Sequence, residues 1–252
     1  MIELLLQPEL LSTLGGTAFV GLTLITVFRS LDPDIVADDY HSCRGGWHES
    51  YLNGCEEGLL QVPQQPVNTY TNLAYLAAGL YVDLQLDSAA SLVFLLTMAY
   101  LCIGSSLYHA TSTRWAGMLD VTAIYAVFSS TMVYAGAALV GRAGAPFVPA
   151  LMFVVAGLAA FLLSSRFRRR MEVVIGVFLG ATYLALLVRM AVTGAWTGGP
   201  LLGSSFVLYA LAYWVWTLDK AKAFPLKRWG HGFWHLFSAA ATALVFYVVP
   251  LT

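Results

Sequence analysis

The sequence predicts an all-α polytopic membrane protein, and two observations predict it: the composition and the length of the apolar segments. Hydrophobic residues make up 59% of the 252 positions and charged residues only 11%, whereas about 25% of the residues are charged in an ordinary soluble domain. The apolar residues gather in eight stretches that are continuous rather than alternating. Such stretches form helices that cross the roughly 30 Å hydrocarbon core of a bilayer.

The eight stretches follow one another along the chain with polar or proline-containing connections between them. Their limits are 9–28, 66–82, 88–110, 118–139, 146–164, 172–193, 201–217 and 231–250. Prolines stand at or just before the starts of several stretches, where a helix tolerates them: Pro63, Pro66, Pro146, Pro200 and Pro225. Stretches 66–82 and 201–217 are the shortest that we assign as membrane-spanning helices.

The first stretch, 9–28, has the length of either a signal peptide or a retained helix. A signal peptide begins with a basic region and ends at a small-residue cleavage site. Here Glu3 and Glu9 occupy the beginning, and no clear cleavage site precedes Arg29. We therefore expect a retained helix over residues 1–29, an acidic loop over 30–65 and the remaining helices over 66–252.

The distribution of lysine and arginine predicts the orientation of the helices. The connections 29–65, 111–117, 165–171 and 218–230 fall on one side of the membrane and hold eleven of these residues, against Arg142 alone on the other side. Positive residues accumulate in cytoplasmic loops. We therefore expect an integral membrane protein with these connections in the cytoplasm and both termini outside.

The composition excludes some classes of function and leaves others open. The net charge is −1, and no basic tract interleaved with aromatic residues is present, so we expect no nucleic-acid partner. Three cysteines are too few for a disulfide framework. A membrane lipid is the partner that we expect, and the sequence does not define an oligomeric state.

Three of the five histidines lie in the apolar stretches with the spacing of a metal site. Ser105 precedes His109 by four residues, and His231 precedes His235 by four residues, so each pair shares one helical face. Asp120 opens the next stretch after His109. In the predicted topology the three histidines and Asp120 lie near the cytoplasmic ends of their helices, and ionisable groups at membrane depth commonly mark function.

These residues predict an intramembrane zinc site. Three neutral imidazoles with one open position form a ligand set for catalytic zinc, which activates water and polarises a carbonyl group. Asp120 is then a general base or a group that orients a histidine, two roles that the sequence does not separate. Ser105 is placed to hydrogen-bond the attacking water or the developing oxyanion.

The chain contains S-x-x-x-H, then ten residues and Asp, and finally H-x-x-x-H. This pattern resembles that of the membrane hydrolase superfamily, which contains alkaline ceramidases, adiponectin and progestin receptors and GPI-lipid remodelling proteins. The resemblance extends from about Cys55 to the C-terminus. Two further segments resemble the ceramidase branch: residues 53–58 (NGCEEG) and 65–72 (QPVNTYTN).

The resemblance implies a seven-helix core around a zinc ion held by His109, His231 and His235, with stretch 9–28 as an extra helix. It implies an alkaline ceramidase-like lipid amidase that releases a fatty acid and a sphingoid base. Two positions depart from the pattern: Gly54 replaces a tryptophan, and Gln65 replaces a carboxylate that helps to bind calcium in eukaryotic members. These departures disfavour Ca²⁺ as a second cofactor.

The acidic loop before the core offers oxygen ligands for a second cation. Asn53, Glu56 and Glu57, together with Asp39, are the residues that could converge on a hard cation. The alternatives are a second zinc site, formed by His41, Cys43, His48 and Cys55, and a solvated acidic cap over the site. The simplest expectation is the cap.

Other functions remain compatible with the histidines. An esterase or phospholipase-like enzyme would use the same zinc chemistry. A receptor-type seven-helix protein would hold a structural or weakly catalytic zinc and would show no turnover. A haem protein with paired axial histidines would contain iron, although the third histidine, the serine and the aspartate disfavour it.

Overall fold

A computed structural model describes residues 63, 65–111, 114–167, 171–221, 223, 225 and 229–252. The predicted helix 9–28, nearly all of the acidic loop and its candidate cation ligands Asn53, Glu56 and Glu57 lie outside the described residues. Within these ranges the regular structure is entirely helical and contains no strand. The all-α fold class is confirmed for this part of the chain.

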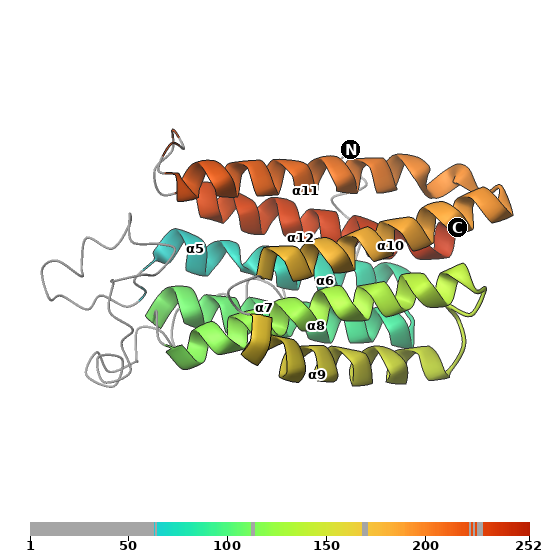
Figure 1. Ribbon diagram of the computed structural model, residues 1–252, viewed down its shortest axis with the longest axis horizontal. Helices are drawn as coiled ribbons and strands as arrows, with labels where there is room; N and C mark the ends of the chain where they lie inside the picture. Colours follow the sequence, from blue (N-terminus) through green and yellow to red (C-terminus); the bar gives the residue numbers. More distant parts are fainter. Residues whose placement is uncertain are drawn as a thin grey trace, which may run out of the picture.

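The described helices run roughly along one long axis and form a bundle (Figure 1). They are α5 (Pro66–Thr71), α6 (Leu73–Leu86), α7 (Ala89–Thr111), α8 (Arg114–Leu139), α9 (Phe147–Phe167), α10 (Met171–Thr193), α11 (Gly199–Lys220) and α12 (Gly230–Val248). Two short 3₁₀ turns, Trp196–Gly198 and Val249–Leu251, precede α11 and follow α12. The boundaries differ from the predicted ones by a few residues, and Asn72 separates α5 from α6.

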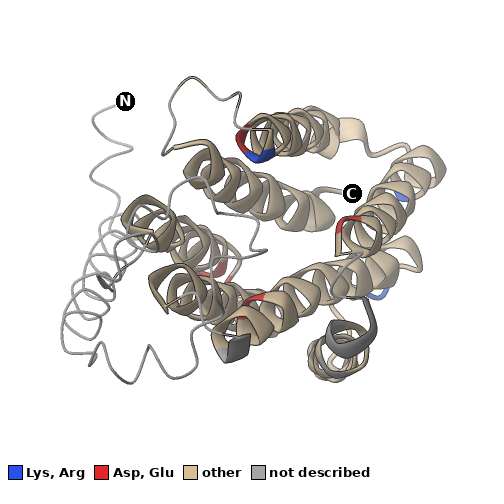
Figure 2. Ribbon diagram, turned by 60° about the vertical axis from the view of Figure 1, so that its left-hand side comes forward, with Lys and Arg blue, Asp and Glu red and all other residues tan. Residues whose placement is uncertain are grey.

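Five segments of the described chain are long and apolar enough to cross a membrane: Ala89–Thr111, Ala116–Leu139, Met171–Thr193, Trp196–Lys220 and Gly230–Leu251. Large apolar side chains such as Val177, Val192 and Phe206 are exposed on the outside of the bundle, where water would disfavour them and lipid would not. Charged residues are sparse along the helices (Figure 2). These features support an integral, multi-pass membrane protein, and the count of seven core helices stays a prediction.

Aromatic stacking joins the two helices that carry the candidate histidines. Phe246 of α12 stacks on Phe94 of α7 with ring centroids 4.3 Å apart and on Tyr134 of α8 at 4.4 Å. Stacked pairs of this kind contribute about 0.5–1.5 kcal/mol of stability beyond the contribution of the apolar area that they bury. The cluster fixes α12 against α7 and α8 in the interior of the bundle.

Paired hydroxyl groups connect α12 to its other neighbours. Tyr75 of α6 bonds Ser238 at 2.7 Å, and Tyr209 of α11 bonds Thr242 at 2.6 Å. Each pair gives a tyrosine hydroxyl inside the bundle a hydrogen-bond partner on α12, as is common between membrane helices. These bonds hold α6 and α11 on α12 in addition to the apolar packing.

Helices α7 and α8 lie in close contact at Gly104. A Cβ atom added there would lie 3.0 Å from the carbonyl carbon and oxygen of Leu119 and 3.2 Å from the backbone nitrogen of Asp120. Only a residue without a side chain allows this approach, because the opposing atoms belong to the backbone and cannot rotate away. The contact places the turn of Ser105 beside the turn of Asp120.

We expect Gly104→Ala to destabilise the protein by about 1–3 kcal/mol, since α7 and α8 must move apart to admit the methyl group. Gly136→Ala in α8 is the control, because a Cβ at Gly136 meets nothing within 4 Å. Thermal unfolding in detergent measures the effect. Equal unfolding temperatures for the two variants would contradict the close packing at Gly104.

Candidate metal centre

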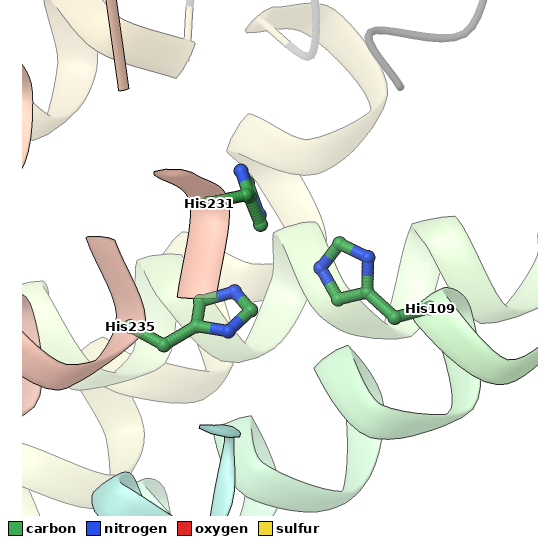
Figure 3. A group of neighbouring side chains, drawn as sticks. All are labelled: His109, His231 and His235. Carbon is green, nitrogen blue, oxygen red and sulfur yellow. The ribbon is translucent and has the colours of Figure 1, made fainter. Parts of the chain in front are cut away.

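The structure brings the three predicted histidine ligands together. His109 lies in the last turn of α7, while His231 and His235 lie in the first two turns of α12. Their exposed fractions are 1%, 8% and 2%. One ring nitrogen from each residue lies within 4.8 Å of the other two, and Figure 3 shows the rings converging from the two helices.

The donor set suits a transition-metal ion. The ring centroid of His109 lies 4.8 Å from that of His231 and 5.1 Å from that of His235. The centroids of the two α12 rings, His231 and His235, lie 4.6 Å apart. Three neutral imidazoles match zinc chemistry, whereas Ca²⁺ and Mg²⁺ require oxygen ligands. A buried group that could hold a metal ion is therefore present, and its chemistry fits zinc.

Two of the three rings are hydrogen-bonded at Nδ1 by residues of the α5 region. The Oε1 atom of Gln65 lies 2.9 Å from Nδ1 of His109, and the Oγ1 atom of Thr71 lies 2.9 Å from Nδ1 of His235. The backbone N–H of Gln65 also donates to the carbonyl oxygen of His109 at 3.0 Å. With Nδ1 engaged in these bonds, Nε2 is the atom by which each of the two rings would hold a metal ion.

Helix α5 packs between α7 and α12, and small residues on both sides allow it. A Cβ added at Gly232 of α12 would lie 3.0 Å from Cγ1 of Val67 and 3.2 Å from Cγ2 of Thr71. On the other side, Ser106 of α7 donates its hydroxyl to the carbonyl oxygen of Thr69 at 3.1 Å. Ser106 therefore serves helix packing, as small polar residues of membrane helices commonly do.

The two remaining predicted residues occupy neighbouring turns. Ser105 is buried on α7 one turn before His109, and Asp120 is half-buried on α8. The close approach of Gly104 to the backbone of Asp120 brings these turns side by side. Their assignment as catalytic residues stays a prediction.

A buried carboxylate that the sequence did not predict lies at the end of α11. The predicted helix stopped at residue 217, but α11 extends to Lys220, and Asp219 is only 4% exposed. Its carboxylate packs on the first residue of α12: a Cβ at Gly230 would lie 2.5 Å from Oδ1 of Asp219. A negative charge at a helix N-terminus is favourable, so Asp219 supports the turn that carries His231.

Helical periodicity is the signal that could have found Asp219. The buried residues at this end of α11 recur at helical spacing and end on the carboxylate: Ala212, Val215, Trp216 and Asp219. The predicted stretch 201–217 leaves Asp219 in the connection 218–230. No such signal marks Thr71, whose partner is distant in sequence, and Gln65 stood out only as a departure from the ceramidase pattern.

Comparison of the chain with protein-family models, with curated proteins and with solved structures gave no match.

Proposed function

We propose that this protein is a zinc-dependent intramembrane hydrolase that cleaves the N-acyl amide bond of a membrane lipid, with a ceramide-like substrate. The observation that carries the proposal is the buried group of His109, His231 and His235 at one end of an apolar helix bundle. Three neutral ligands leave the full charge of a divalent ion available for electrophilic chemistry. The resemblance of Ser105, Asp120 and the histidine spacing to alkaline ceramidases supports the same reaction.

Zinc bound to the three histidines would supply Lewis acidity toward water and toward the amide carbonyl. Asp120 would take one proton from the attacking water as its oxygen bonds to the carbonyl carbon, and would deliver that proton to the nitrogen as the C–N bond breaks. The products are a fatty acid and a free amine. Ser105, one turn before His109, would donate a hydrogen bond to the oxygen that becomes negative.

The location of the site favours a lipid substrate. His109 ends one apolar helix and His231 begins another, so the site lies near one face of the bundle rather than at its middle. At that depth an acyl chain can enter from the bilayer while water reaches the amide from the adjacent aqueous side. The excess of lysine and arginine in the connections at this end favours the cytoplasm, with both termini outside.

Purified protein supplied with N-acyl sphingoid lipids in mixed micelles tests the proposal. We expect release of fatty acid and amine in equal amounts, loss of this activity after treatment with a chelator, and recovery with added zinc. Zinc binding without turnover on any N-acyl lipid would contradict the hydrolase and favour a receptor-type protein. Cleavage of ester lipids with intact amides would shift the assignment to an esterase.

A further inference from the structure

We propose that the segment Gln65–Thr71 sets the tautomers of two metal ligands, so that His109 and His235 both present Nε2 to the ion. The inference rests on the metal centre of the proposed function and assigns positioning roles to two residues outside the predicted site. The acceptors come from one short segment, and the histidines that they bind come from two different helices.

The bond at His109 can have only one direction. Asn68 donates its Nδ2–H to Oε1 of Gln65 at 2.8 Å. The oxygen of the Gln65 amide, rather than its nitrogen, therefore faces both Asn68 and His109. A carbonyl oxygen only accepts hydrogen bonds, so Nδ1 of His109, at 2.9 Å, must carry the proton. The neutral ring then has its lone pair on Nε2, the atom that would bind a metal ion.

The bond at His235 has the same direction for a different reason. The hydroxyl of Thr71 has one proton, and it is directed to backbone carbonyl oxygens one turn earlier, at 2.9 Å for Val67 and 3.2 Å for Asn68. The oxygen of Thr71 therefore accepts from Nδ1 of His235. Its lone pair is then on Nε2, which would be the ligand atom, as in His109.

These bonds fix the rings before the ion arrives. Partners of this kind set the orientation and basicity of a ligating histidine, and their loss typically lowers metal affinity by about 10–100-fold. Gln65 is also neutral, so it orients His109 without adding a negative charge to the site. Gln65 stands where the ceramidase pattern has a carboxylate. In this protein its role is to orient a zinc ligand.

The experiment compares zinc affinity across matched variants by competition with a chromogenic chelator. Gln65→Met and Thr71→Val keep the size of each side chain and remove the acceptor, and we expect zinc affinity to fall by about 10–100-fold in each. Gln65→Glu and Thr71→Ser keep an acceptor and should retain affinity within a few-fold of the unaltered chain.

Thr69→Val is the matched control. Thr69 is buried in the same helix, and within the described part of the chain its hydroxyl bonds only the carbonyl oxygen of Gln65, four residues earlier. A general disturbance of α5 would weaken zinc binding in this variant as well, whereas the tautomer role leaves its affinity unchanged.

Ring-¹⁵N NMR of the unaltered, metal-free protein gives a second test that requires no variant to fold. At about pH 8, where imidazole is neutral, we expect His109 and His235 as Nδ1–H tautomers. Nε2–H tautomers, or unchanged zinc affinity in Gln65→Met and Thr71→Val, would overturn the inference while leaving the metal centre intact. Absence of zinc binding in the unaltered protein would overturn both proposals.

Discussion

His235→Ala is expected to abolish lipid amide hydrolysis and to remove the rise in unfolding temperature that added zinc gives the unaltered protein. His235 is buried, and its ring lies beside those of His109 and His231. Removing one of three ligands leaves two, a loss that exceeds the roughly 10–100-fold effect of an orienting partner. A ligand that binds only the folded state raises its stability, so thermal unfolding with and without zinc measures the loss.

Leu236→Ala is the control for this variant. Leu236 lies next to His235 on α12, but its side chain is exposed on the outside of the bundle. We expect this variant to keep both activity and zinc stabilisation. Zinc stabilisation of His235→Ala equal to that of the unaltered chain would contradict the three-histidine site.

Asp120→Asn is expected to lower kcat by about 10²–10⁴-fold, the usual contribution of a general base, while zinc binding is retained. An amide has nearly the same shape as a carboxylate but does not accept the proton of water. Rates with a ceramide-like lipid and zinc content of the same preparation are the two measurements. Because Asp120 lies at the α7–α8 approach, the unfolding temperature of the variant should also be compared.

Ser105→Ala separates the two polar residues of the site. Loss of one hydrogen-bond donor to a developing oxyanion costs about 10²–10³-fold in kcat, and no change in zinc affinity should accompany it.

An Asp120→Asn variant with undiminished turnover would remove the base role. Loss of zinc in that variant would instead make Asp120 an orienting group for a histidine.

The histidine cluster was predictable from the sequence because local rules place its members. Residues four apart share a helical face, and the apolar segments fix where His109, His231 and His235 lie along their helices. Membrane helices bring equivalent ends together at the same face of the bilayer. The depth of the three histidines in the membrane and the helical faces that they share predict that they form one group. In the structure one ring nitrogen from each lies within 4.8 Å of the other two.

The hydrogen-bond partners of the cluster depend on packing that no local pattern encodes. Thr71 is separated from His235 by 164 positions and Gln65 from His109 by 44. The contact of Thr71 with His235 arises because Gly232 lets α5 approach α12 closely. The contact of Gln65 with His109 depends on the start of α5 lying against the end of α7, where the backbone N–H of Gln65 donates to the carbonyl oxygen of His109. Asp219 is unpredicted for a simpler reason: the apolar stretch ends at residue 217, while the helix continues to Lys220.

Metal analysis of the purified protein beside His235→Ala tests the central claim most directly. Elemental analysis by mass spectrometry, with protein concentration from amino-acid analysis, gives the number of metal ions per chain. We predict about one zinc per chain in the unaltered protein and almost none in His235→Ala, with both preparations folded by circular dichroism. Iron in place of zinc, or no metal in folded unaltered protein, would contradict a zinc hydrolase.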